Sequence, residues 1–116
     1  MIIKPFGPPS EQMAQLGRHE WSVVRLFELS KDLPVMEIPL NHLNIYHKFN
    51  SITLREFVGH MMSVNNADLS FPIIMDEDGE VLDGRHRIMK ALITGAETIK
   101  AVRFEENPSP CRVSDD

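Results

Sequence analysis

The spacing of apolar residues along the chain predicts several short helices. In residues 22–31 the apolar positions recur at helical spacing, Ser22 is a suitable N-cap, and Pro34 ends the segment. A second helix is predicted over residues 53–65, because Thr53 and Glu56 form a capping box. Its apolar positions are Leu54, Phe57, Val58, Met61 and Met62.

Four short segments are predicted as strands: 35–40, 71–75, 80–82 and 99–104. The second and third are joined at residues 76–79, where Asp-Gly supplies the positive φ that a hairpin turn needs. A third helix is predicted from Asp83 to about Thr94, with Gly95 as its C′ residue. We therefore expect an α+β fold: a small mixed sheet with about three helices packed on it.

The chain is expected to divide into an arm, one domain and a tail. Residues 1–20 are rich in turn formers and predict an extended arm, with one short helical turn after Ser10. The domain spans 21–105, and residues 106–116 read as a flexible tail. The arm can pack on its own domain or on a second copy, and Trp21 can anchor it or lie in a dimer contact. A homodimer is therefore one of the expected arrangements.

Composition narrows the classes of partner. The 116 residues fit one domain, and 42% hydrophobic with 25% charged residues is ordinary for a globular chain. The net charge of −5 argues against duplex DNA as the main partner. No apolar run reaches the roughly 18 residues of a membrane span, and residues 1–5 lack a signal peptide's apolar core. We expect a cytoplasmic protein, no membrane partner, and an inert thiol at Cys111, the one cysteine.

The third helix carries the main chemical signal. Ile88, Ala91 and Leu92 are expected to face the core. His86, Arg87 and Lys90 then lie together on the opposite face, near the helix start. A helix N-terminus is already positive, so a bound anion would relieve the repulsion. Gly84 has no Cβ and so leaves room for a close ligand, and an arginine can bind phosphate with two hydrogen bonds. The candidate anion-binding residues are Asp83, Gly84, Arg85, His86, Arg87 and Lys90.

A purely structural interpretation of the same residues stays open. Asp83 can serve only as the N-cap, and the basic residues at 85–87 can be solvated surface. Gly-x-x-Arg alone is a weak motif that unrelated chains contain. No histidine pair has metal-ligand spacing, so no metal site is predicted, and His60 is expected on the solvent face of its helix.

Residues 73–87 resemble the central hairpin and Gly-x-x-Arg box of the ParB/sulfiredoxin superfamily, and residues 36–43 resemble its opening strand. The resemblance covers about residues 35–104. It implies that Gly84, His86 and Arg87 contact nucleotide phosphates, with ATP, ADP or CTP and Mg²⁺ as the expected ligands. Phosphoryl transfer or nucleotide hydrolysis is the implied reaction class. Glu37 on the opening strand is a candidate general base or metal partner, with a surface carboxylate as the alternative if its side chain points outward.

The departures from that family limit the expected activity. Arg85 stands where sulfiredoxins have their catalytic cysteine, so sulfinic acid reduction is not expected. No helical DNA-binding domain follows residue 105, and the loop after the opening strand holds His47-Lys48 instead of an acid. Whether the chain is an enzyme therefore stays open. The alternatives are a non-catalytic protein-interaction module and an accessory protein related to DNA partition or nucleases.

Overall fold

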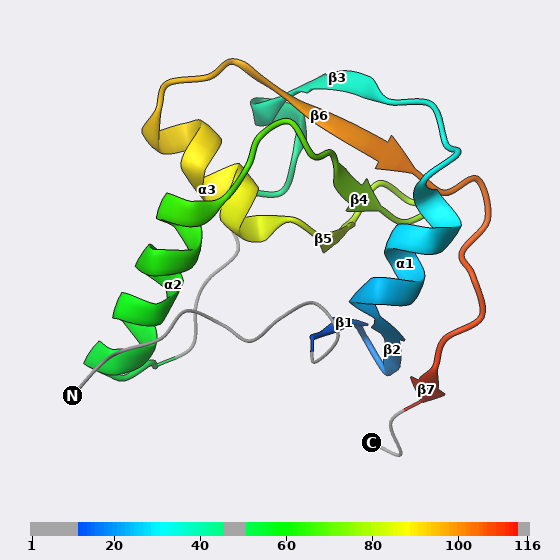
Figure 1. Ribbon diagram of the computed structural model, residues 1–116. Helices are drawn as coiled ribbons and strands as arrows, with labels where there is room; N and C mark the ends of the chain where they lie inside the picture. The colour runs from blue at the N-terminus through cyan, green and yellow to red at the C-terminus, as the bar shows by residue number, and fades with distance from the viewer. Residues whose placement is uncertain (1–11, 46–50, 114–116) are drawn as a thin grey trace.

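A computed structural model describes residues 12–45 and 51–113, and the predictions for 1–11, 46–50 (with His47-Lys48) and 114–116 lie outside these ranges. The fold is mixed α+β, as expected, with three α-helices and two sheets in the described part (Figure 1). The elements in chain order are β1 (Met13–Leu16), β2 (His19–Ser22), α1 (Val23–Ser30), β3 (Met36–Pro39), the 3-10 helix Leu40–His42, α2 (Leu54–Asn66), β4 (Ile73–Met75), β5 (Val81–Asp83), α3 (Arg85–Ile93), β6 (Thr98–Arg103) and β7 (Arg112–Val113).

The larger sheet has the strand order β3-β6-β4-β5. Strands β4 and β6 are parallel and the other neighbours are antiparallel, so the sheet is mixed, as predicted. The β4–β5 turn contains Gly79 at a φ of 85°. Asp76 of the predicted turn is buried, and its carboxylate accepts hydrogen bonds from the amides of Asp78 (2.9 Å) and Glu80 (2.8 Å). The acidic turn is thus built around an internal carboxylate.

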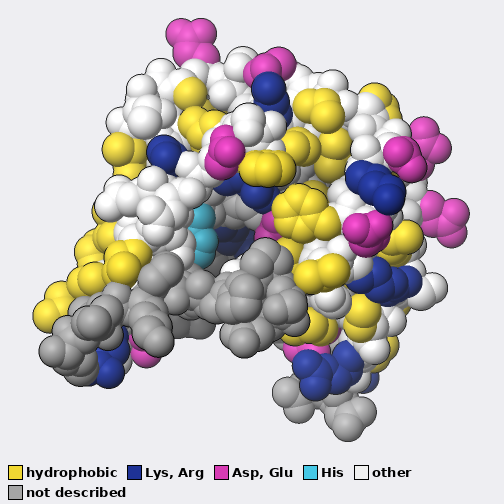
Figure 2. Space-filling model, viewed as in Figure 1, with side chains coloured by type: hydrophobic (Ala, Val, Ile, Leu, Met, Phe, Trp, Pro, Cys, Tyr) yellow, Lys and Arg dark blue, Asp and Glu magenta, His cyan; other side chains and the backbone are white. Residues whose placement is uncertain are grey.

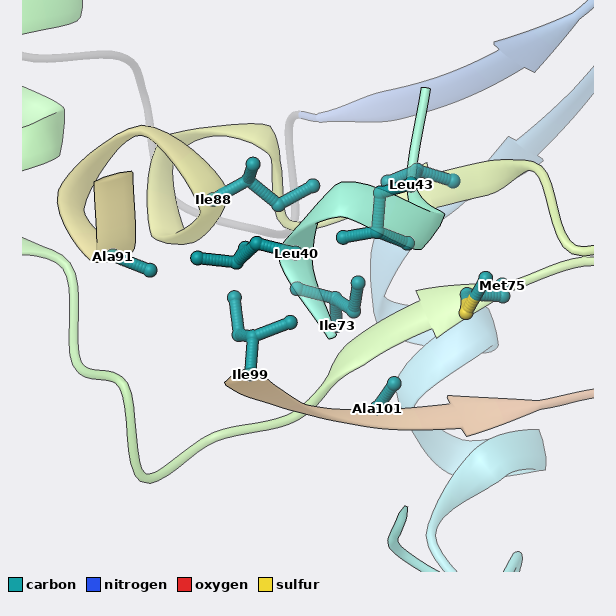
Figure 3. Close-up of a cluster of buried hydrophobic side chains, with 9 residues drawn as sticks. Leu40, Leu43, Ile73, Met75, Ile88, Ala91, Ile99 and Ala101 are labelled. Carbon is teal, nitrogen blue, oxygen red and sulfur yellow. The ribbon is translucent and has the colours of Figure 1, made fainter. Parts of the chain in front are cut away.

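Both faces of the larger sheet are covered at its inner strand β4, whose three residues are all apolar and buried. Successive side chains of a strand point to opposite faces. Ile73, Met75 and Ala101 face the cluster that contains α3 and the 3-10 helix (Figure 3). Ile74 and Val102 face a second cluster with α1 and the β1–β2 hairpin. Two cores therefore share one sheet, and both reach its edge strand β5, through Val81 on one face and Leu82 on the other.

The N-terminal part of the described chain differs from the expected arm. Residues 13–22 form the antiparallel β1–β2 hairpin, and β7 pairs with β2 to complete a three-stranded sheet. Trp21 is 1% exposed, and its indole N–H donates to the carbonyl of Pro108 (2.9 Å). The segment after residue 105, expected as a tail, returns to this sheet as far as Val113. The hairpin and the segment after residue 105 are held by contacts between residues far apart in the sequence. Local propensity does not predict such contacts.

Helices α1 and α2 begin where the sequence predicts. Ser22 accepts from the amide of Arg25 (3.4 Å), and Thr53 accepts from the amide of Glu56 (3.1 Å). The buried residues of α2 are Gly59 and Val64, whereas its apolar residues Leu54 and Phe57 are 81% and 52% exposed. In Figure 1 the C-terminal half of α2 lies beside α3, and its first turns extend away from the sheet. None of the helices in the described ranges has the length and apolar character of a membrane-spanning segment.

Candidate functional site

The junction between β5 and α3 differs from the predicted one by a residue. Asp83 still pairs with Ile74 in the sheet, so Gly84, at a φ of 115°, is the N-cap instead of Asp83. A Cβ at position 84 would lie 2.5 Å from Cγ2 of Ile73. Packing against β4 and the left-handed backbone therefore require glycine here, independently of any ligand. Gly84 also provides no side-chain cap to the helix start.

Arg87 lies beside the carboxylate of Asp83. Its Nη2 donates to Oδ2 at 2.7 Å, and the side chains are only 14% and 18% exposed. Nε of Arg87 is buried and, within the described residues, has no hydrogen-bond partner. The guanidinium is thus held at the junction by one carboxylate while part of its donor capacity is unused.

Lys90 does not extend the cationic face. Its Nζ donates to the carbonyl oxygens of Ala67 (2.7 Å) and Asn65 (3.1 Å), at the C-terminal end of α2. A cation at a helix C-terminus satisfies carbonyls that lack an intrahelical partner and complements the helix dipole. The predicted ligand residue is therefore engaged in joining α3 to α2. Leu92, predicted to face the core with Ile88 and Ala91, is 46% exposed.

His86 forms a pair with His60 that the sequence did not predict. Nδ1 of His60 lies 2.9 Å from Nε2 of His86, and both rings are half-buried. Burial lowers the pKa of His86 from its ordinary value of 6.5, the neighbouring His60 lowers it further, Asp83 raises it, and Arg87 lowers it. The neutral form of His86 is therefore favoured near neutral pH. His60 is on the inner side of α2, not on the solvent face.

An open groove of about 1090 Å³ runs along the start of α3. Its walls come from the β1–β2 hairpin, α1, the second half of α2, the segment 67–71, and residues 82–87 with Met89. Figure 2 shows a hollow with histidine on its wall and Lys or Arg atoms deeper inside. Arg85 lines the groove with an exposed side chain that makes no hydrogen bond or ion pair within the described ranges.

Among the described residues, the charges that line the groove are close to balanced. Arg85 and Arg87 face Asp83 and Asp68. The hydroxyl of Ser70 and then its amide lower the pKa of Asp68, so this carboxylate is ionised near neutral pH. The predicted residues at 83–87 therefore do meet at one groove, but their basic excess is smaller than the sequence suggested. An anion would have to bind chiefly through Arg85, the uncapped helix start and whatever donors of Arg87 it can reach.

Glu37 is outside this groove. Its strand, β3, forms one edge of the sheet and β5 forms the other. The Glu37 carboxylate accepts a hydrogen bond from the hydroxyl of Thr98 at 2.7 Å, and the side chain is exposed. The structure therefore does not bring the candidate general base to the candidate phosphate residues.

Cys111, expected to be an inert thiol, has polar neighbours. The amide of Ser22 donates to its sulfur at 3.4 Å, and the guanidinium of Arg25 does so at 3.6 Å. These contacts, in that order, lower the pKa of the exposed thiol. The same guanidinium also donates to the carbonyl of Ser109. The thiol is therefore more readily ionised than the sequence indicated.

Comparison with known proteins adds no further constraint on the groove. Neither family models, nor curated proteins, nor solved structures gave a match to this chain. Across residues 12–45 and 51–113, no group of three or more His, Cys, Asp or Glu side chains has the arrangement of a metal centre.

Proposed function

We propose that this chain is an anion-binding domain whose groove receives the phosphate groups of a nucleotide at the start of α3. The observation that carries the proposal is the position of Arg85, His86 and Arg87 at a helix start that has no side-chain cap and opens into a groove. The helix dipole and the first amide groups favour negative charge at such a place.

The likeness of residues 73–87 to the ParB/sulfiredoxin hairpin and box supports a nucleotide as the ligand. The segment runs as strand, turn, strand and helix, which is the context in which such a box binds phosphate. The groove offers apolar wall residues such as Phe27 and Met89 beside the charged ones, and these suit the base or sugar of a nucleotide. The proposal is limited to binding, because Glu37 is remote from the groove.

The test is calorimetric titration with sulfate, inorganic phosphate, ATP, ADP and CTP, the nucleotides with and without Mg²⁺. We expect at least one phosphate compound to bind at millimolar concentration or below. Arg85→Ala should weaken that binding about tenfold, the loss expected for a charge-assisted hydrogen bond. Lys100→Ala is the matched control, since Lys100 is exposed on β6 and does not line the groove. Absence of heat and of thermal stabilisation with every ligand would contradict the proposal.

A second candidate function is a protein-interaction module in which the groove accepts an acidic side chain. The ion pair of Arg87 with Asp83 favours it, because a site whose arginine already has a carboxylate partner needs less negative charge from a ligand. A carboxylate ligand would bind without Mg²⁺ and without preference for a base. Titration with acetate and with a short glutamate-containing peptide distinguishes this function from nucleotide binding.

A further inference from the structure

We propose that the His60–His86 pair takes up a proton when an anion occupies the groove, so that the affinity for an anion of fixed charge rises as pH falls. This inference rests on the proposed anion-binding function. It assigns a role to His60, which belongs to a different helix from the candidate phosphate residues, as a positioning residue for His86.

The geometry of the pair is suited to holding one proton. Nδ1 of His60 and Nε2 of His86 are 2.9 Å apart, the ring centroids are 5.2 Å apart, and both residues line the groove. Two neutral imidazoles already share a hydrogen bond in this arrangement, since one ring nitrogen donates and the other accepts. Adding one proton converts it to a charge-assisted bond between an imidazolium and an imidazole, which is stronger. A second proton would place two positive rings in contact.

Without a ligand, the surroundings of His86 oppose that proton. Among the described residues, the charged or titratable groups that act on it are His60 from α2, Asp83 from β5 and Arg87 from α3 itself. Partial burial, His60 and Arg87 lower the pKa of His86, and Asp83 raises it. Asp83 is also the ion-pair partner of Arg87, so its charge is largely offset.

An anion in the groove would favour the protonated form of the His60–His86 pair. A dianion near Arg85 and the helix start would cancel the repulsion from Arg87 and the dipole, and would itself attract an imidazolium. By linkage, a ligand that favours the protonated site binds more tightly where the proton is available. Protonation and anion binding would therefore support each other at one groove.

The test uses sulfate, which stays a dianion across the range, by calorimetry between pH 5.5 and 8.5. Paired buffers of different ionisation enthalpy give the protons taken up per sulfate bound. We expect an uptake of about half a proton or more per sulfate near pH 6.5, and an affinity that rises about threefold or more per pH unit around it. No binding at any pH would overturn both this inference and the proposed function. Binding without proton uptake would overturn this inference alone.

The decisive variant is His60→Asn. Its amide can hydrogen-bond close to the former position of Nδ1 but cannot take up a proton, so a purely structural role would be preserved. We expect proton uptake to fall by at least half and the pH dependence to flatten, with affinity at pH 8.5 within about twofold of the original. His42→Asn, at an exposed position of the 3-10 helix, is the control and should change nothing. Full proton uptake in His60→Asn would overturn the inference.

A measurement on the unaltered chain guards against a variant that fails to fold. Titration of the imidazole resonances by NMR, with and without sulfate, follows each ring of the pair. Saturating sulfate should raise the apparent pKa of the pair by about one unit or more. An unchanged titration of the pair in the presence of bound sulfate would overturn the inference.

Discussion

The guanidinium of Arg87 lies 2.7 Å from the carboxylate of Asp83, four residues earlier and on the other side of the strand–helix junction. The pair joins the last residue of β5 to the first turns of α3. It stabilises the junction, and it also supplies a negative charge where a ligand's negative charge is proposed to bind. The carboxylate of Asp83 is therefore expected to increase the stability of the fold and to decrease the affinity for an anion.

Asp83→Asn is expected to separate these two effects. Breaking a largely buried ion pair leaves a cation with weaker partners, so the free energy of unfolding should fall by about 1–3 kcal/mol. Sulfate or nucleotide should bind several-fold more tightly, because the competing carboxylate is gone. Urea unfolding and calorimetric titration measure the two quantities. Weaker anion binding in a folded Asp83→Asn would show that Asp83 does not compete with the ligand.

Gly84→Ala should be strongly destabilising. The methyl group would meet Ile73 at 2.5 Å on a backbone with a φ of 115°, so both a clash and conformational strain arise. A loss of about 3 kcal/mol or more is expected in urea unfolding. Gly95→Ala is the matched control, since Gly95 has a φ of 77° but nothing within 4 Å of its Cβ position, and should cost about 1 kcal/mol. Equal losses in the two variants would show that Ile73 yields to the methyl group.

Lys90→Met tests whether this lysine binds ligand or joins two helices. Methionine keeps much of the apolar stem but removes the two hydrogen bonds to the end of α2. We expect thermal unfolding to show a loss of about 1–2 kcal/mol, with sulfate affinity unchanged within about twofold. A large loss of affinity with unchanged stability would return Lys90 to the binding site.

Local chemistry made much of the fold predictable. Ser22 and Thr53 cap helices because their hydroxyls accept hydrogen bonds from amides three residues later. The hairpin turn at Asp78-Gly79 was predictable because glycine readily adopts the positive φ that the turn needs. The Asp83–Arg87 pair has the ordinary i,i+4 spacing, yet a predicted N-cap role for Asp83 concealed it.

Contacts between distant residues could not be predicted in the same way. The amide of Cys111 donates to the carbonyl of Glu20, and no local pattern shows that this segment returns to the hairpin. The His60–His86 contact likewise depends on how α2 crosses α3. A partial signal existed, because His60 is four residues before Val64, which is 2% exposed, and so lies near the buried face of its helix.

Cys111 is expected to react faster with iodoacetamide near pH 7 than an unperturbed exposed thiol does. The amide of Ser22 and the guanidinium of Arg25 lower its pKa, which increases the thiolate fraction. Arg25→Gln should shift the pH profile of alkylation to higher pH, and Arg18→Gln, whose side chain belongs to the β1–β2 turn, should not. Identical profiles for Arg25→Gln and the unaltered chain would contradict the assigned role of Arg25.

Stability without ligand is expected to fall on mild acidification, because of His86. Burial, chiefly, holds the pKa of this imidazole below the 6.5 of an exposed histidine, so the unfolded chain binds the proton more readily. The stabilising contribution of neutral His86 is therefore complete above pH 6.5 and is lost as pH falls below it toward the folded-state value. Thermal unfolding between pH 7.5 and 5.5 should show a falling Tm. In His86→Gln, whose amide replaces Nε2 without titrating, the fall should be shallower, whereas His42→Gln should match the unaltered chain. An equally steep fall in His86→Gln would assign the acid sensitivity to other groups.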